Sequence, residues 1–172
     1  MNRRQIELVR LSFERIEPVH TLFADLFHRR LFLMAPAVQR LADSDPERRD
    51  RALFATLREI ITGLDRLDIL LPSLASTARG LSFQGVTAAD YDAVGASLEW
   101  TLHQVIAQAP GVVLAWMETY ELLAGVMKRA ANDPTVLPPP PPPRRAFITH
   151  SYSDRPPATH TAPLPPPSSR LA

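Results

Sequence analysis

The sequence of 172 residues contains no cysteine. Without thiols the chain can form no disulfide bond, thiolate metal site or iron–sulfur cluster, and it has no cysteine nucleophile. The same absence excludes a covalent thioether link to a haem or a bilin. Any metal or cofactor would therefore have to be held by other side chains.

Long apolar runs and an excess of charge are also missing. Glu7, Arg10 and Glu14 interrupt the apolar residues near the N-terminus, which is not the pattern of a signal peptide, and no window resembles a membrane span. The 19 Lys and Arg residues nearly balance the 18 Asp and Glu residues, leaving a net charge of +1. This balance gives no electrostatic reason to expect nucleic acid or an anionic membrane as a partner. We therefore expect a cytoplasmic protein that binds neither.

Proline divides the chain into two parts. The composition changes near Asp133, and residues 138–143 are an uninterrupted run of proline. Proline has no amide donor and restricts the residue before it, so this stretch cannot form a helix or a central strand. We predict a helical domain over residues 1–132, followed over 133–172 by a proline-rich tail that is extended or disordered.

The first part of the chain has the pattern of an all-α domain. Apolar residues recur at helical spacing between well-marked breaks, and no alternating pattern typical of a strand appears. About six or seven helices are predicted. The predicted N-terminal caps pair Asn2 with Gln5, Ser44 with Glu47 and Thr87 with Asp90. Helices are also predicted to end or begin at Pro18, Pro36, Pro72 and Pro110.

Three segments resemble a known family. Residues 63–72 resemble the end of the E helix and the turn into the F helix of bacterial single-domain globins and of the haem-globin domain of flavohaemoglobins. Residues 91–102 and 115–126 resemble the G helix and the H helix of the same proteins. The resemblance covers roughly residues 3–131 and implies a globin-like helical sandwich. It also implies a haem between the E and F helices, bound through one histidine of the F helix, and the binding of oxygen or another diatomic gas.

The residues that should hold the haem differ from the family pattern. The position of the proximal histidine is Leu81, which has no lone pair to donate, and no histidine occurs between His28 and His103. The family phenylalanine against the haem face is replaced by Ala42. The glutamate that flavohaemoglobins use near the end of the H helix is replaced by Ala131. We therefore predict no cofactor, although the resemblance makes haem possible.

Four further pocket positions follow from the resemblance. His28 occupies the place of a B-helix tyrosine, and it either binds a ligand from the distal side or lies on a partly solvated helix face. Arg49 takes the distal polar position of the E helix, where it either meets an anionic group such as Asp50 or points into water. Leu53 follows on the same helix. Tyr91 is either a ligand or a core tyrosine with a satisfied hydroxyl.

These observations leave three functional hypotheses open. The first is a haem-free, degenerate globin that acts as a sensing or interaction module, as haem-free globin-like sensor domains of bacteria do, with a pocket that is empty, collapsed or filled by a small apolar ligand. The second is a haem globin that uses His28 or Tyr91 as its iron ligand. The third is a passive scaffold that dimerises through its last two helices, with the tail as the functional part. No reductase domain or catalytic constellation is recognised, so we do not predict an enzyme.

Overall fold

The computed structural model describes residues 2–106 and 110–133, and over these residues the chain is helical without a strand. The all-α prediction is therefore confirmed. The tail prediction lies outside the described residues. The helices in chain order are α1 (Arg3–Ile16), the 3₁₀ turn η1 (Glu17–Val19), α2 (His20–Met34), α3 (Pro36–Gln39), α4 (Pro46–Gly63), α5 (Leu67–Phe83), α6 (Ala88–Val105) and α7 (Pro110–Ala131).

Side-chain caps define three of the helix starts. Asn2 caps α1 and exchanges two hydrogen bonds with Gln5, as predicted. At the start of α6, the Asp90 carboxylate accepts hydrogen bonds from the backbone N–H and the hydroxyl of Thr87, at 2.8 and 2.7 Å. Both arrangements satisfy donors that the first helical turn leaves unpaired.

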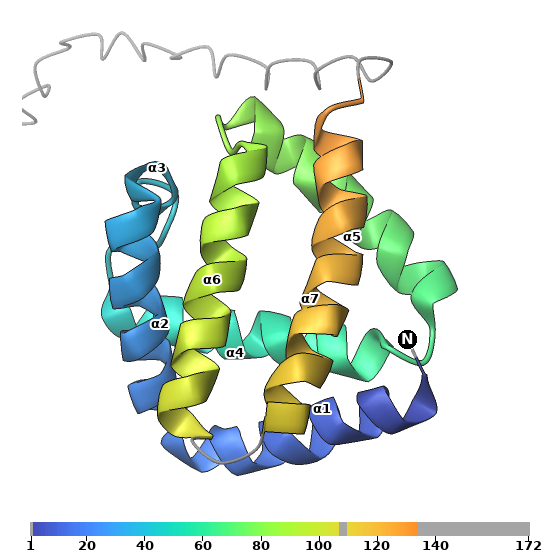
Figure 1. Cartoon of the computed structure of the whole chain (residues 1–172). Helices are drawn as coiled ribbons and strands as arrows, with labels where there is room; N and C mark the ends of the chain where they lie inside the picture. The colour runs from blue at the N-terminus through green and yellow to red at the C-terminus, as the bar shows by residue number, and fades with distance from the viewer. Residues whose placement is uncertain (1, 107–109, 134–172) are drawn as a thin grey trace, which may run out of the picture. The chain divides into compact units, whose positions relative to one another are not determined.

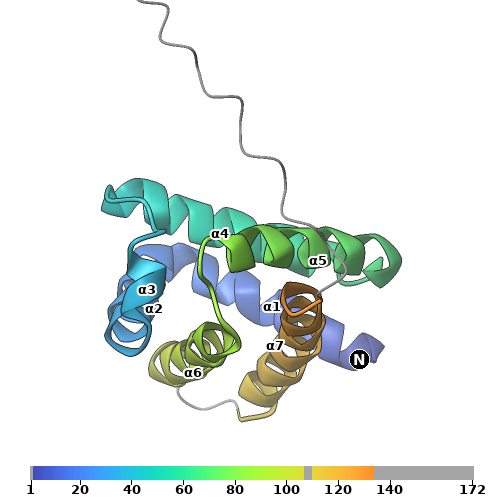
Figure 2. The ribbon, with the colours of Figure 1, turned by 90° about the horizontal axis from the view of Figure 1, so that it is seen from above.

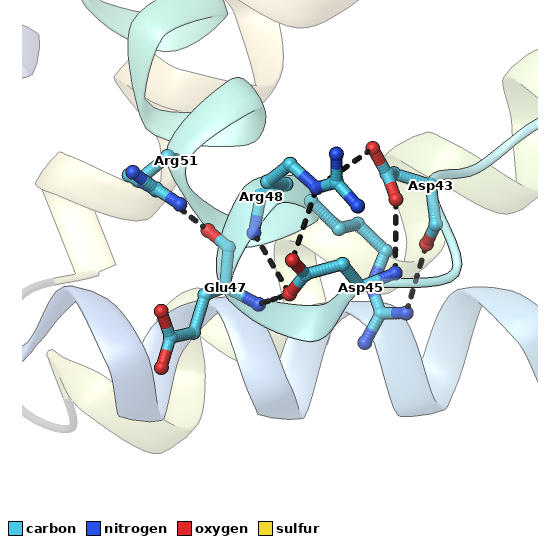
Figure 3. Close-up of polar contacts among 6 residues, drawn as sticks. Asp43, Asp45, Glu47, Arg48 and Arg51 are labelled. Carbon is cyan, nitrogen blue, oxygen red and sulfur yellow. Dashed lines mark hydrogen bonds and ion pairs between the residues drawn. The ribbon is translucent and has the colours of Figure 1, made fainter. Parts of the chain in front are cut away.

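The third cap differs from the prediction by one residue. Asp45, and not Ser44, is the N-cap of α4, because its carboxylate accepts from the backbone N–H groups of Glu47 and Arg48 (Figure 3). Asp45 also pairs with the Arg48 side chain at 3.0 Å. Pro46 is the first helical residue, which explains the choice: a proline at this position makes the residue directly before it the cap.

The prediction that a helix starts at Pro72 is wrong. Helix α5 begins at Leu67, and Pro72 lies inside it. Proline removes one backbone hydrogen bond from a helix and crowds the preceding turn. The apolar residues around it offset this cost, since Leu70 is buried and Leu67, Leu71 and Leu74 pack against the core. The break at Pro18 is confirmed, because α1 ends at Ile16 and α2 begins at His20.

Helices α2, α6, α7 and α5 lie in a row, and helices α1 and α4 cross it. Helices α6 and α7 run antiparallel side by side, α2 packs against α6, and α5 packs against α7 (Figure 1). Helices α1 and α4 cross this row at a steep angle, with α1 against α7 and α4 against α2 (Figures 1 and 2). The short α3 lies at the end of α2. Every long helix therefore covers part of one shared core.

The core is apolar with a few satisfied polar groups. Its fully buried members include Val9, Ile16, Phe23, Leu64 and Leu102. Where α1 meets α7, the indole N–H of Trp116 donates to the hydroxyl of Ser12 at 2.8 Å, and Ser12 donates to a carbonyl of its own helix. This bond gives the buried Trp116 a partner, as buried tryptophans usually require.

Candidate functional site

A close helix crossing fixes the position of Tyr91. Gly95 of α6 faces the ring of Tyr120 on α7 so closely that a Cβ atom there would lie 2.6 Å from the ring carbon Cε1. The hydroxyl of Tyr120 donates to the backbone carbonyl of Tyr91, one turn before Gly95. Tyr91, which is buried, is thereby held at the N-terminal end of α6.

Beside Tyr91 lies a small apolar cavity. It has a volume of about 220 Å³ and is bounded by α3 and the turn after it, by the end of α5 and by the start of α6. Its lining residues are Val38, Leu41, Ala42, Leu81, Val86, Asp90, Tyr91 and Val94. Three positions that the sequence places in the pocket by resemblance, at 42, 81 and 91, therefore surround one cavity.

Tyr91 and Asp90 are the polar side chains of the lining. The hydroxyl of Tyr91 is buried and has no hydrogen-bond partner among the described residues. Burial, and to a lesser degree the Asp90 carboxylate, raise the pKa of Tyr91, so this hydroxyl is protonated and able to donate. Asp90 is already engaged by Thr87 at the helix cap. The surface of the cavity is therefore almost entirely apolar, and the Tyr91 hydroxyl is buried behind it.

A second polar cluster lies between α2 and α4. His28 is buried, with Nδ1 3.2 Å from Oδ1 of Asp50, which is an ion-pair distance, but the two atoms are not aligned for a hydrogen bond. The ring of Phe32 stacks on His28 at 5.6 Å, and the guanidinium of Arg49 lies over the same ring at 5.4 Å. The partly solvated alternative for His28 does not apply, because its side chain is 9% exposed.

Charge and burial act on His28 in opposite directions. Burial is the largest influence and lowers the pKa of His28 below its ordinary 6.5, and the neighbouring Arg49 cation lowers it further. The Asp50 carboxylate and the carbonyl of Ala24 oppose this shift without reversing it. His28 is therefore neutral at physiological pH, next to one anion and one cation.

The remaining pocket positions are only partly engaged. Arg49 is half-buried and donates from Nη1 to the carbonyl of Asp43 at 3.3 Å, while its buried Nε has no partner among the described residues. It neither pairs with Asp50 nor swings fully into water. Leu53 is half-buried and packs against the core rather than lining the cavity.

The cavity does not fit a haem held as the resemblance implies. Its lining contains no histidine or methionine, and the described histidines other than His28, at 20 and 103, are exposed. Its 220 Å³ falls below the roughly 300–1,000 Å³ typical of pockets for drug-sized molecules. Within the described residues, no group of three metal-ligating side chains converges anywhere. The side-chain oxygens of the lining belong to Tyr91 and to Asp90, whose Oδ2 is engaged by Thr87.

Several site residues were not found from the sequence. Phe32 carries no signal in the sequence, although its ring contacts both His28 and Arg49. Val38, Val86 and Val94 carry none either, because single apolar residues do not reveal which cavity they face. The proximity of Asp50 and His28 requires α2 and α4 to be placed in space, so no local pattern could show it.

A larger open groove lies elsewhere, between α4 and the first half of α5. It has a volume of about 620 Å³ and is lined by residues that include Arg58, Thr62, Arg66, Ile69 and Leu70. This groove contains none of the pocket positions expected from the sequence. Among the described helices, none combines the length and the apolarity needed to span a bilayer.

Comparison with known proteins gives the class of the fold. No family model matches the chain. The structure is similar to that of the engineered carbene transferase RmaNOD, a putative nitric oxide dioxygenase from Rhodothermus marinus, with a TM-score of 0.62 and 22% sequence identity over 76% of this chain and 93% of that chain. It also matches the closed form of the globin domain of HGbRL, with 32% identity over 76% of this chain and 96% of that domain, at a TM-score of 0.36.

The first of these structures shows that the chain has a globin-like fold. The fold predicted from residues 63–72, 91–102 and 115–126 is therefore confirmed. The segments that resemble the G and H helices lie in α6 and α7, and residue 63, where the first segment begins, is the last residue of α4. A shared fold does not by itself carry a shared function, because function depends on the residues of the site.

Proposed function

We propose that this protein is a haem-free globin-like module, without enzymatic activity, whose small apolar cavity supports a sensing or interaction role. The observation that carries the proposal is the cavity beneath Tyr91, where Leu81 stands at the position that the resemblance assigns to the iron ligand. An aliphatic side chain gives iron no donor atom. A ligand of this cavity would be much smaller than a porphyrin.

Packing supports the same proposal. Leu81, Val94 and Val38 are each partly buried against other side chains. Full burial of an aliphatic side chain stabilises a fold by roughly 1.5–3 kcal/mol, and partial burial contributes part of this. A pocket that closes on such residues gains stability without a cofactor, whereas a pocket built for haem would leave apolar walls exposed when empty.

The direct test is addition of hemin to the full chain, followed by visible spectra of the oxidised and reduced forms. We expect no sharp Soret band that saturates at one equivalent. The competing hypothesis, a haem globin with another ligand, predicts such a band, and it predicts that His28→Ala or Tyr91→Phe abolishes it. A saturating band that either substitution removes would overturn the proposal.

A second variant asks whether the pocket merely lacks a ligand. Leu81→His places an imidazole at the cavity, and Phe83→His places one on an exposed position of the same helix as a matched control. We expect neither variant to bind haem at one equivalent, because about 220 Å³ does not accommodate a porphyrin. A Soret band in Leu81→His alone would mean that the cavity opens on coordination, and the size part of the proposal would then be wrong.

A further inference from the structure

We propose that the outer face of α2 pairs, antiparallel, with the same face of a second copy of this chain. The inference concerns a surface and not the cavity, so it goes beyond the function proposed above and does not depend on it. Three observations carry it, namely the exposed leucines of α2, the arrangement of its charges and the contrast with the exposed face of α7.

An apolar stripe runs along the outside of α2, which lies at the edge of the row of helices (Figures 1 and 2). Leu22, Leu26, Arg29 and Leu33 follow one another at intervals of four, three and four residues, which places them on one face of the helix. Leu22 is 55% exposed and Leu33 is 80% exposed, the highest value among the large apolar residues that the structure describes. Exposed apolar residues aligned in this way are typical of an interaction surface.

The stripe is symmetrical about its own midpoint. Leu22 and Leu33 lie at equal distances along α2 from the point between Phe27 and His28. A two-fold interface joins residue i to residue j and residue j to residue i. A two-fold axis at the level of this midpoint therefore places Leu22 of each copy opposite Leu33 of the other. Both leucines then leave water, which favours association.

The charges of this face complement one another in the same arrangement. Asp25 and Arg29 form an ion pair on one side of the stripe, with Nη2 of Arg29 2.7 Å from Oδ2 of Asp25. Their side chains are 45% and 74% exposed, and exposed pairs of this kind contribute little to stability. The antiparallel pairing brings Asp25 of one copy to within about 1.5 Å of the level of Arg29 of the other. Each carboxylate then meets a second guanidinium, so the face attracts its own copy.

The exposed face of α7 has the opposite property. Leu114 and Leu122 are 59% and 37% exposed, and Glu118, also exposed, lies halfway between them. An antiparallel pairing of α7 with itself through these leucines places Glu118 of each copy against the Glu118 of the other. Like charges that face each other across an interface disfavour association. The comparison therefore favours α2 over α7 as the helix that pairs with itself.

The first experiment measures the oligomeric state of the full chain by sedimentation velocity between 10 μM and 1 mM. Helix α2 has 15 residues, so the contact is small, and we expect a dissociation constant on the order of 10–100 μM. Leu33→Glu, which places a charge opposite Leu22, should weaken the dimer at least tenfold. Leu114→Glu, an equally exposed leucine of α7, is the matched control and should change the constant less than twofold. A chain that stays monomeric at 1 mM, or a dimer that only Leu114→Glu disrupts, would overturn the inference.

A second experiment tests the charge pairing and uses no apolar substitution. Asp25→Arg and Arg29→Asp each bring like charges together across the interface, so each variant alone should dimerise at least tenfold more weakly than the wild type. An equimolar mixture of the two variants should restore association, because every cation of one chain then meets a carboxylate of the other. Native mass spectrometry identifies the mixed dimer. If loss of the pair within α2 were the only effect, the mixture would stay as weak as its components, and the antiparallel pairing would be wrong.

Discussion

At the scale of single residues, the site depends on groups whose partners come from other helices. Leu81, Ala42 and Tyr91 could be placed in one pocket from the sequence because the family resemblance supplies their register. His28 and Arg49 could be marked as pocket positions in the same way. Their environment could not, because Phe32 and Asp50 reach them across the contact of α2 with α4. Local sequence patterns do not encode such contacts.

The buried His28 makes stability depend on pH. Its pKa is lowered in the folded protein, so the native state binds fewer protons than the unfolded state as the pH falls below 6.5. The contribution of His28 to the free energy of unfolding is therefore complete above that pH and is lost on acidification. We expect urea midpoints of the wild type to fall between pH 7.5 and pH 5 by more than those of His28→Gln.

Substitution of the charged neighbours of His28 tests the cause of its pKa shift. An NMR titration of the His28 ring should give a midpoint below 6.5. Asp50→Asn removes an influence that raises the pKa of His28, so the midpoint should fall further. Arg49→Gln removes an influence that lowers the pKa, so the midpoint should rise. Shifts in the opposite directions would contradict the assignment of these charges.

At the scale of helices, the start or end of a helix could be predicted well where a single residue determines it. The cap at Asn2, the cap at Thr87 and the break at Pro18 are local effects, and all three were predictable. Ser44 and Asp45 are both good caps, and the proline at position 46 was the signal that favours Asp45. The prediction at Pro72 was wrong because the burial of Leu70 and its neighbours, a tertiary effect, outweighs the low helix propensity of proline.

The crossing of α6 and α7 predicts opposite effects for two glycine substitutions. In Gly95→Ala the new methyl group would lie 2.6 Å from the Tyr120 ring, which its hydrogen bond to Tyr91 holds in place. We expect a loss of about 1–3 kcal/mol in the free energy of unfolding, as for other overpacked cores. Gly80→Ala, in α5, meets nothing within 4 Å and should stabilise by about 0.4–1 kcal/mol.

Urea unfolding followed by circular dichroism measures both changes under the same conditions. The pair controls for the general gain in helix propensity on replacing glycine by alanine. If Gly95→Ala proved as stable as Gly80→Ala, the close approach of α6 and α7 described here would be wrong.

At the scale of the whole molecule, the fold was more predictable than the site. Helical periodicity and three matched segments were enough for the globin-like arrangement, because burial of many apolar residues fixes it collectively. The cavity depends on a few side chains around it, and its volume changes with each of them. Sequence reasoning therefore reached the positions in the pocket but not its size.

The domain boundary is a prediction about the whole chain. Within residues 2–106 and 110–133, the buried core extends from Val9 to Ala124. We therefore expect a chain of residues 1–132 to unfold within a few degrees of the full chain and to sediment in the same oligomeric state. A large drop in the melting temperature would mean that residues 133–172 contribute packing. A dimer that persists on truncation and in Leu33→Glu would favour the scaffold that dimerises through its last two helices, and a monomer both with and without the tail would rule it out.

Helix α5 lines both the large groove and the small cavity. Leu70 contributes to the large groove and Leu81 to the small cavity, and eleven residues separate them on one continuous helix. Eleven residues are about three turns, so both side chains project from nearly the same face, about 16 Å apart. Because α5 runs without a break through Pro72, one helix forms a wall of both openings.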